Sequence, residues 1–321
     1  MNSDMKVVAI GGGTGLSTML RGLKLHTRNI TAIVTVADDG GSSGVLRNDL
    51  GMLPPGDVRN CVSALAEMDP VLGELLNFRF NEGTLAGHSL GNLILAALNE
   101  TSSSFDEAVK KFSRITGIVG TVYPVTNENI QLSAILKDGS RIDGESHIGV
   151  HRENNGIDHV ILTPAHPKAV NGVISAIKKA DIIVLGPGSL YTSIIPNLLV
   201  DGVVDAIKKS NALKIYVCNI MSQAGETEGY TLSRHLEAIE RHSYKGIADV
   251  VIANNAVIPE SLKIKYAEEY AHIVPIDAER IMDRCSVLQG NLLLVRNEKI
   301  RHNFSRLSRT IIQLAKTKGL R

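Results

Sequence analysis

The sequence predicts an α/β fold, in which a mostly parallel sheet is flanked by helices, and three observations lead to it. Short apolar runs typical of buried strands alternate with segments whose apolar residues recur at helical spacing. The first apolar run passes through a glycine-rich loop into a helix, between Lys6 and Leu23. Small and polar residues follow several of the predicted strands, where an open parallel sheet binds its ligands.

The composition indicates a globular chain with a sizeable core, since 44% of the 321 residues are hydrophobic. A net charge of +1, 4% aromatic residues and no tryptophan give no argument for a nucleic-acid partner. Cys61, Cys218 and Cys285 are odd in number and far apart, so we expect neither a disulfide framework nor a zinc site. No signal-peptide pattern opens the chain, and no run approaches the roughly 18 apolar residues of a membrane span. We therefore expect a cytoplasmic protein.

The glycine-rich loop is the first candidate for ligand binding. Val7–Ile10 predicts a strand, Gly11–Gly13 a loop, and the apolar spacing from Leu16 onward a helix. This order presents backbone N–H groups and a helix N-terminus to an anion, usually a phosphate. The loop lacks the last glycine of G-x-G-x-x-G, so a plain tight turn remains an alternative.

The second predicted strand favours a nucleotide as the ligand. Ile30–Ala37 is strongly β-prone and ends at Asp38 and Asp39. A carboxylate at this point accepts hydrogen bonds from ribose hydroxyls and repels a 2′-phosphate. The loop and the carboxylates together indicate a nucleotide without a 2′-phosphate. Asp38, Asp39 and Asp57 could also hold a Mg²⁺ ion that bridges to phosphates, although ribose contacts and capping need no metal.

Residues 40–60 contain further candidates. Gly40–Gly44 is predicted to be a flexible stretch and Pro54–Gly56 a turn. Asp57 follows the turn, where it either caps the next helix or acts in the site, and both interpretations stay open. Arg59 lies in the first turn of that helix, where the helix dipole disfavours a cation, so it is a candidate for holding a bound anion.

The remaining pattern predicts helices and strands along one domain spanning residues 1–321. Helices are expected at 71–81, from 87–92 onward, and at 105–115, 168–179, 198–208, 231–241 and 303–318. Strands are expected at 119–125, 130–136, 141–148, 159–162, 181–185, 214–218, 250–253, 271–275 and 292–296. We interpret residues 118–163 as an antiparallel β insertion or extension, and 303–318 as a basic helix. The carboxyl ends of the parallel strands then carry Gly11–Gly13, Asp38–Asp39, Gly186–Ser189, Asn219 and Asn254, which predicts one cleft.

Two motifs resemble catalytic or metal sites. GHSLG at 87–91 matches the G-x-S-x-G of serine hydrolases, but no convincing strand precedes it. A helix N-terminus, at which His88 and Ser89 cap the helix or accompany an anion, is favoured. His147 and His151 have a spacing that suits a metal on a helix, but they fall in a predicted β stretch, so surface histidines are expected.

Arg301 stands apart from the other basic residues near the C-terminus. A run of this kind usually forms a solvated helix face, and it comprises Lys299, Arg301, Arg306, Arg309, Lys316, Lys318 and Arg321. Arg301 follows a predicted strand and turn, where the chain could return to the cleft. Since the glycine loop contains no Lys or Arg, a pyrophosphate bound there needs a cation from elsewhere, and Arg59 and Arg301 are the candidates.

Five blocks of the sequence resemble one known family. The chain looks like the bacterial gluconeogenesis factors, the CofD-like group related to 2-phospho-L-lactate transferase. The resemblance runs essentially end to end and rests on GGGTGLS at 11–17, TVADDGGSSGVLR at 35–47, LGMLPPGDVRN at 50–60, GHSLGNL at 87–93 and GPGSLYTSIIPNL at 186–198.

The resemblance implies a Rossmann-like fold and a cytoplasmic protein required for normal cell shape during growth on gluconeogenic carbon sources. It also implies binding of UDP-sugars such as UDP-N-acetylglucosamine, and so a connection to cell-wall precursor supply. The residues expected to bind the ligand are Gly12, Gly13, Thr14, Gly15, Leu16, Ser17, Asp38, Asp39, Ser42, Ser43, Asp57, Arg59, Asn60, His88, Ser89, Gly91, Asn92, Gly186, Pro187, Gly188, Ser189, Asn219 and Arg301.

Two functions remain open. The first is a regulatory protein that binds a nucleotide-sugar without turning it over, with no required cofactor and with cell-wall synthesis proteins or a second copy of the chain as partners. The second is a Mg²⁺-dependent transferase that uses a nucleotide-linked donor, as the related transferase does. A dehydrogenase is disfavoured because no catalytic pair is apparent, although NAD could occupy the cleft as a ligand. No catalytic residue is named.

Overall fold

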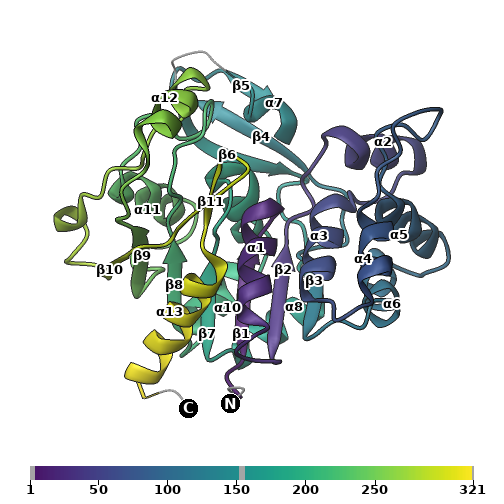
Figure 1. Cartoon of the computed structure of the whole chain (residues 1–321), viewed down its shortest axis with the longest axis horizontal. Coiled ribbons are helices and arrows are strands. Elements are labelled where there is room, and N and C mark those ends of the chain that lie inside the picture. Colours follow the sequence, from purple (N-terminus) through teal and green to yellow (C-terminus); the bar gives the residue numbers. More distant parts are fainter. Residues whose placement is uncertain (1–3, 152–155, 320–321) are drawn as a thin grey trace.

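The computed structural model describes residues 4–151 and 156–319, and it confirms the predicted fold class (Figure 1). Within these residues a seven-stranded parallel sheet has the order β10–β9–β8–β7–β1–β2–β3. The strands in chain order are β1 (Val7–Gly11), β2 (Ile30–Val34), β3 (Thr121–Pro124), β7 (Ile182–Leu185), β8 (Leu213–Val217), β9 (Val250–Asn254) and β10 (Ser286–Gly290). The central strands read as continuous apolar runs because helices bury them on both faces.

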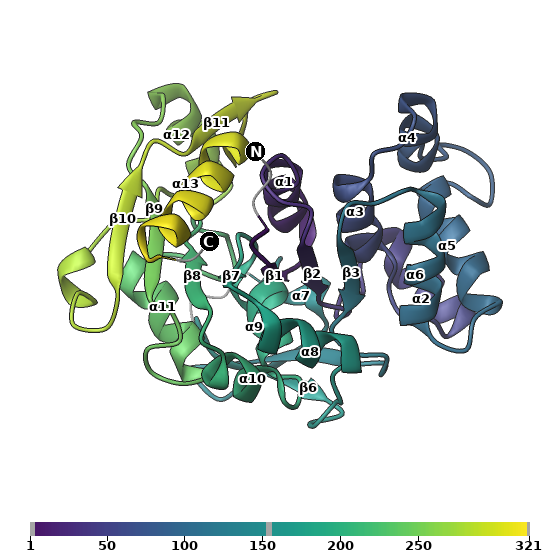
Figure 2. The ribbon, with the colours of Figure 1, turned by 90° about the horizontal axis from the view of Figure 1, so that it is seen from below.

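Helices form two layers around the sheet (Figure 2). One face carries α1 (Gly13–Leu23), α3 (Gly56–Leu65) and α13 (Phe304–Thr317). The other carries α8 (Asn171–Lys179), α9 (Ile195–Leu198), α10 (Val203–Lys209) and α11 (Leu232–Arg241). Beside β3, a helical lobe is made by α2 (Gly41–Leu50), α4 (Pro70–Asn77), α5 (Leu90–Glu100) and α6 (Phe105–Ile115). In the part of the chain that the structure describes, no helix is both long enough and apolar enough to cross a membrane.

Smaller elements lie at the carboxyl end of the parallel sheet, which is the upper end in Figure 1. A three-stranded antiparallel sheet has the order β5 (Arg141–Asp143), β4 (Gln131–Leu136), β6 (Ile157–Thr163), and the short helix α7 (Glu145–Ile148) packs on it. A hairpin of β11 (Leu293–Arg296) and β12 (Lys299–His302) follows β10, while α12 (Glu260–Glu268) follows β9. The π-helix η1 (Leu190–Ile194) connects β7 to α9, and the 3₁₀ turn η2 (Ala278–Arg280) precedes β10.

The prediction that residues 118–163 form an antiparallel β insertion or extension is partly wrong. The segment predicted at 119–125 forms β3, which pairs in parallel with β2 and is an edge strand of the main sheet. Only β4, β5 and β6 are antiparallel to one another. The second half of the strand predicted at 141–148 is the helix α7, which follows Gly144, a residue with a φ of 97°. A positive φ is easily adopted by glycine and breaks the strand.

The stretch predicted as flexible, Gly40–Gly44, is instead the start of α2. A Cβ atom at Gly44 would lie 2.1 Å from the backbone oxygen of Asp39, so the small residue permits a close turn into the helix. Gly51 ends α2 in the left-handed conformation, with a φ of 63°. The glycines that suggest flexibility therefore serve packing and capping.

Other boundaries also differ from the predictions. The helix predicted at 198–208 begins only at Val203, as α10, because residues 199–202 form a turn after α9 that ends at Gly202, whose φ is 83°. Residues 271–275 form no strand but a single bridge between Ile273 and Met221. The strands β10 and β12 and the helix α12 were not predicted. Arg321 of the basic run, and residues 152–155 of the predicted insertion, lie outside the described residues.

Gly22 provides a first test of how the layers pack. It lies where α1 contacts α13, and a Cβ atom there would be 2.3 Å from the backbone oxygen of Phe304. We expect Gly22→Ala to lower the free energy of unfolding by about 1–3 kcal/mol, because the two helices must separate. Gly73→Ala in α4 is the control: its new methyl group meets only the Met68 side chain, at 3.9 Å, and alanine favours helix. Urea denaturation measures the free energy of unfolding of both variants. Equal stability of Gly22→Ala and Gly73→Ala would contradict the packing argument.

Candidate functional site

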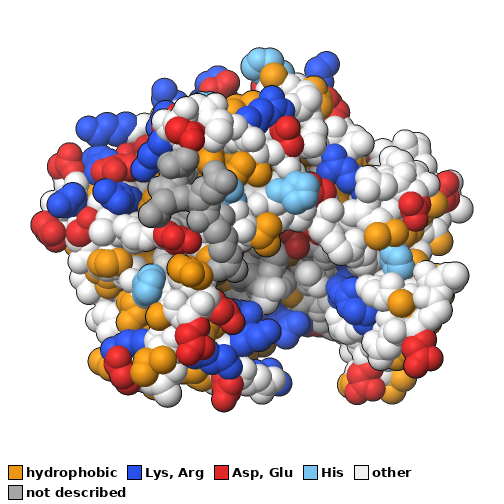
Figure 3. All heavy atoms as spheres, turned by 90° about the horizontal axis from the view of Figure 1, so that it is seen from above, with side chains coloured by type: hydrophobic (Ala, Val, Ile, Leu, Met, Phe, Trp, Pro, Cys, Tyr) orange, Lys and Arg blue, Asp and Glu red, His pale blue; other side chains and the backbone are white. Residues whose placement is uncertain are grey.

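A pocket of about 500 Å³ lies at the carboxyl edge of the parallel sheet, within the usual range for small-molecule sites of roughly 300–1,000 Å³. Its walls come from the loops after β1, β7 and β8, from α12 and from β12. In Figure 3 the corresponding face is hollowed near its middle, with basic side chains on the rim of the hollow. The lining residues are Gly12, Gly13, Thr14, Gly15, Thr18, Gly149, Pro187, Gly188, Ser189, Ser193, Asn219, Ile220, Met221, Ser222, Gln223, Ala224, Glu226, Tyr266, Glu269, Ala271, Ile300, Arg301 and His302.

The glycine loop forms one wall of the pocket through close backbone contact with the loop after β7. A Cβ atom at Gly15 would lie 2.5 Å from the Pro187 oxygen, and one at Gly188 would lie 3.3 Å from the Gly12 oxygen. Only glycine lets the two loops approach this closely. Gly15 therefore packs against a neighbouring loop, a role that the incomplete G-x-G-x-x-G pattern did not reveal.

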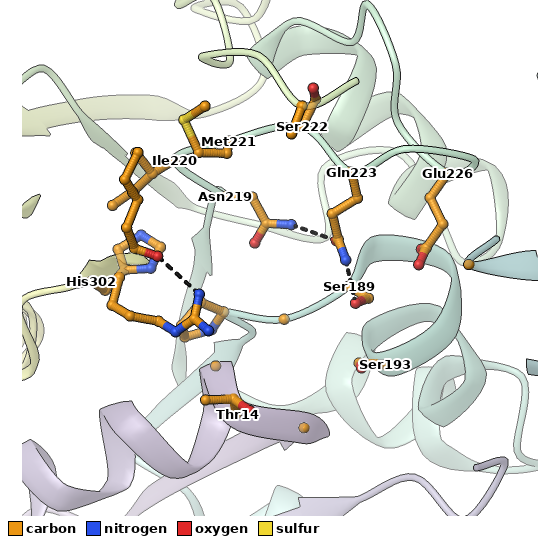
Figure 4. A pocket seen from close by; sticks show the side chains of 18 of the residues that line it. Thr14, Ser189, Ser193, Asn219, Ile220, Met221, Ser222, Gln223, Glu226 and His302 are labelled. Carbon is orange, nitrogen blue, oxygen red and sulfur yellow. Dashed lines mark hydrogen bonds between the residues drawn. The ribbon is translucent and has the colours of Figure 1, made fainter. Parts of the chain in front are cut away.

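A chain of polar side chains crosses the pocket (Figure 4). The amide of Asn219 donates to Gln223 Oε1 at 3.3 Å, and Gln223 Nε2 donates to Ser189 Oγ at 2.7 Å. These residues follow β8 and β7, so the chain joins two strand ends that the sequence predicted to share one rim. Gln223 was missed because no motif or strand end marks it in the sequence.

Arg301 is the one Lys or Arg side chain among the described residues that line the pocket. It lies on β12, whose hairpin turn is formed by Asn297 and Glu298 with φ values of 51° and 58°. Two successive positive φ angles are typical of a type I′ turn, which returns the chain directly. Arg301 Nη1 donates to its neighbour's oxygen, that of Ile300, at 3.0 Å, and β12 contacts α1. The hairpin thus brings the guanidinium group back to the cleft.

Several predicted ligand residues come together outside this pocket. Ser42 Oγ lies 2.9 Å from His88 Nδ1 and accepts from Asn92 Nδ2 at 3.1 Å. Arg59 is buried and donates to Asn77 Oδ1 at 2.7 Å and to Asn92 Oδ1 at 3.4 Å. This network joins α2, α3 and α5. Of the two cations proposed for a pyrophosphate, Arg301 lines the pocket and Arg59 does not.

The other predicted residues have local roles in the structure. Leu16 lies in the core, and Ser17 Oγ donates to Thr14 O. Ser43 Oγ accepts from Gly56 N, and a Cβ atom at Gly91 would meet Leu76 O at 2.7 Å. The residues of the prediction that do not line the pocket are Leu16, Ser17, Asp38, Asp39, Ser42, Ser43, Asp57, Arg59, Asn60, His88, Ser89, Gly91, Asn92 and Gly186.

Asp57 does not cap its own helix. The residue before α3 is Pro55, no side chain caps that helix, and Asp57 Oδ2 instead accepts from Gly13 N at 2.6 Å. The carboxylate thus occupies a backbone donor of the glycine loop, where a phosphate was expected. Burial, with the charge of Asp38, raises the pKa of Asp57 to about 6, against the hydrogen bond from Gly13 and the charge of Arg59.

Glu226 binds the start of a second helix that faces the pocket, and no motif marks this residue in the sequence. Its carboxylate accepts from Tyr191 N at 3.1 Å and from Thr192 Oγ1 at 3.0 Å, at the beginning of η1. Burial raises the pKa of Glu226 to about 7, although these hydrogen bonds oppose the shift. Two anion-binding positions at the rim are therefore already filled by the chain's own carboxylates.

Asp38 lies close enough to Asp57 to interact electrostatically with it, and both Asp38 and Asp39 accept hydrogen bonds from backbone groups. Asp39 accepts from Glu145 N and Ser146 N at 3.1 and 2.8 Å, and Asp38 accepts from Gly40 N at 2.9 Å. In residues 4–151 and 156–319, no three Asp, Glu, His or Cys side chains converge as metal ligands would. The three carboxylates predicted as Mg²⁺ ligands already accept from backbone N–H groups: Asp57 from Gly13 N, Asp38 from Gly40 N, and Asp39 from Glu145 N and Ser146 N.

The two motifs that resemble catalytic or metal sites have structural explanations. Ser89 is 1% exposed, follows no strand, and its Oγ accepts from Asn92 N at the start of α5. It is the expected helix cap and not the nucleophile of a hydrolase. His147 lies on α7, not in a strand as predicted, and its Nδ1 lies 2.8 Å from Asp143 O.

Glu145 gives the site a testable pH dependence. Burial, followed by the charges of Asp38, Glu226, Asp57 and Asp39, raises its pKa from 4.5 to about 8. The folded protein then binds this proton more tightly than the unfolded chain, so the associated stability is present at low pH and is lost as the pH rises to about 8. We expect Glu145→Gln to flatten the fall in melting temperature between pH 5 and 8, relative to the wild type. An unchanged slope in this variant would contradict the assignment.

The sequence profile described as "2-phospho-L-lactate transferase CofD" matches residues 7–293. The protein named "Gluconeogenesis factor" in Halalkalibacterium halodurans is 46% identical over 309 residues, 96% of this chain and 95% of its own. The protein of that name in Bacillus subtilis (strain 168) is 42% identical over 318 residues, 98% of this chain and 100% of its own. The chain belongs to the gluconeogenesis factor family.

The fold of this gluconeogenesis factor family member also matches a solved structure. A crystal structure of a Bacillus halodurans protein superimposes with a TM-score of 0.93 at 45% identity, covering 97% of this chain and 100% of that one. The predicted resemblance to the family and its CofD-like domain is therefore confirmed. Binding of a nucleotide, the choice of sugar and the need for Mg²⁺ remain predictions.

Proposed function

We propose that the protein is a cytoplasmic regulatory factor that binds a nucleoside diphosphate sugar of the UDP-N-acetylglucosamine class without turning it over. One observation carries the proposal: Arg301 lines the same pocket as the backbone of Thr14–Gly15 and Gly188–Ser189. A pyrophosphate between them would meet a guanidinium group and backbone donors, which together suit its oxygens. NAD also contains a pyrophosphate attached to ribose, so it is the natural competitor for the same pocket.

The biological role rests on the family. Relatives at 42–46% identity are named gluconeogenesis factors, which supports a role during growth on gluconeogenic carbon sources. We propose that the bound nucleotide-sugar reports cell-wall precursor supply and that the bound form acts in maintaining cell shape, through cell-wall synthesis proteins. Binding without turnover needs only a cleft and groups that hold the anion, which Arg301 and the backbone of the two loops would supply.

Thermal unfolding tests this function with UDP-N-acetylglucosamine, NAD, GDP or buffer, each with and without Mg²⁺. A ligand at 100 times its Kd stabilises the folded protein by about 2.7 kcal/mol, which is visible as a melting shift. We expect a shift with the UDP-sugar in the absence of Mg²⁺ and recovery of the nucleotide intact. No shift with any UDP-sugar would contradict the proposal.

The carboxylates beside the pocket favour a second candidate function. Glu145 lies within electrostatic range of Asp38, Asp57 and Asp39, and carboxylates near a phosphate site would hold the metal ion that phosphoryl-type transfer uses. The matching CofD profile also carries the name of a transferase. A melting shift with GDP that depends on Mg²⁺, or consumption of a nucleotide-linked donor, would favour this transferase.

A further inference from the structure

We propose that the pocket binds its nucleotide-sugar in one orientation, with the base at the end formed by Ile220 and Ile300 and the sugar at the end formed by Glu226, and that the protein thereby selects sugars without a negative charge. This inference rests on the proposed function and adds the direction of the ligand and the chemical class of its sugar.

The base end is apolar. Ile220 and Ile300 belong to a small hydrophobic cluster with Ile258 and Leu262, separate from the main core, and Met221 and Tyr266 pack against it. A flat base gains from burying its faces on such a surface. In Figure 4, Ile220, Met221 and His302 lie together on one side of the pocket.

His302 supplies unused hydrogen-bonding capacity at this end. The side chain is nine-tenths buried, its hydrogen bond is to the backbone of Cys218, and its Nε2 has no partner among the described residues. Burial lowers the pKa of His302 to about 4, so the ring is neutral. A buried polar atom without a partner is costly, and a polar edge of a base is one way to satisfy it.

The diphosphate lies between the two ends. Along the rim, the ends of β8, β7 and β1 follow one another, Asp38 lies beyond β2, and the hairpin with Arg301 contacts α1. Asn219, Gln223 and Ser189 stand in the middle of this path (Figure 4). A ligand that places its phosphates at Arg301 and Gly15 and its base on Ile220 must therefore extend its sugar toward Glu226.

The sugar end is acidic. Glu226 and Ser193 line it on the side opposite to His302 in Figure 4, and Gly149 continues the wall toward α7. Glu145 of α7 senses the charges of Asp38, Asp39, Asp57 and Glu226, and its own ionisation is suppressed there. Two cations face this group: Arg47 near Asp38 and Asp39, and Arg59 near Asp57, and neither lines the pocket.

A ligand carboxylate at this end would meet the same repulsion as Glu145. Sugar hydroxyls, in contrast, donate hydrogen bonds that carboxylates accept. UDP-glucose and UDP-glucuronate are a matched pair, because they differ only in the replacement of the sugar's CH₂OH group by a carboxylate. We expect UDP-glucuronate to bind roughly tenfold or more weakly, since like charges placed together oppose binding.

Calorimetric titration of the full chain with UDP-N-acetylglucosamine, UDP-glucose and UDP-glucuronate tests the inference. It is run at pH 9, above the pKa values of Glu145 (about 8) and Glu226 (about 7), so that both side chains carry their charge in the wild type. The variants are Glu145→Gln and Glu226→Gln, with Glu74→Gln, exposed on α4, as the control for loss of one negative charge. We expect the preference for UDP-glucose over UDP-glucuronate to shrink in the first two variants and to stay unchanged in the third. Glu145 is only partly buried and its side chain is not needed for a cap, so its variant keeps the test valid if Glu226→Gln does not fold.

The possible outcomes distinguish a failure of this inference from a failure of the proposed function. Binding of all three nucleotides with equal affinity would overturn the orientation and leave the proposed function standing. A preference that persists in both glutamine variants would overturn the electrostatic cause. Failure of UDP-N-acetylglucosamine to bind the wild type would overturn the proposed function and the inference with it.

Discussion

Replacement of Arg301 by glutamine should weaken binding of UDP-N-acetylglucosamine by roughly 10- to 100-fold, because a hydrogen bond to a charged partner is worth about 1.5–3 kcal/mol. Arg301 is the one cation in the lining that the structure describes, so no neighbouring group replaces it. Among the residues that the structure describes, its side chain donates only to the oxygen of the adjacent Ile300, so the variant should melt at the temperature of the wild type. Calorimetric titration measures the affinity and scanning calorimetry the stability.

Arg296→Gln is the matched control for Arg301→Gln. Arg296 lies on the paired strand of the same hairpin, is exposed, and is absent from the pocket lining. The Arg296→Gln substitution removes the same charge at a similar place in the fold. A loss of affinity caused by the overall electrostatic field would therefore appear in both variants. Equal affinities of Arg301→Gln and the wild type would show that the guanidinium group does not hold the diphosphate.

Replacement of Gly15 by alanine should damage both stability and binding. Its Cβ atom would lie 2.5 Å from the oxygen and 2.8 Å from the carbonyl carbon of Pro187, and backbone atoms cannot rotate away as a side chain does. The loops after β1 and β7 must then separate, at a cost of about 1–3 kcal/mol. Since both loops line the pocket, we expect the affinity for UDP-N-acetylglucosamine to fall by tenfold or more, as roughly 1.4 kcal/mol corresponds to tenfold.

Gly149→Ala separates this effect from the mere addition of a methyl group to the pocket. Gly149 also lines the pocket, but a Cβ atom there meets nothing within 4 Å. We expect this variant to melt and bind like the wild type. If Gly15→Ala were as stable as Gly149→Ala in a urea titration, the close contact with Pro187 would not be a constraint on the loop.

Periodicity and turn residues were sufficient to predict most of the fold, and the reasons for the failures are physical. The apolar runs of β1 and β8 and the amphipathic pattern of α6 are local, so the sequence reveals them directly. In contrast, Gly44 looks like a flexible residue until the oxygen of Asp39 is seen beside it. The surrounding sequence does not distinguish a glycine required for close packing from a glycine in a mobile loop.

The site was predictable where it rests on strand ends, and not where it rests on side chains that meet through the fold. Asn219 and Gly188 could be placed at one rim because parallel strands share a carboxyl edge. The bond from Gly13 N to Asp57 joins residues 44 positions apart, and Glu226 reaches Tyr191 from 35 positions away. No local pattern encodes such contacts, so the filling of both helix starts emerged only from the structure.

The crystal structure of the complex with UDP-N-acetylglucosamine, grown without Mg²⁺, tests the central claim most directly. We expect an intact nucleotide in the pocket, with diphosphate oxygens at hydrogen-bonding distance from the Arg301 guanidinium group and from backbone N–H groups of the loops at Gly15 and Gly188. A nucleotide bound elsewhere, or one in this pocket with its diphosphate away from Arg301, would contradict the account.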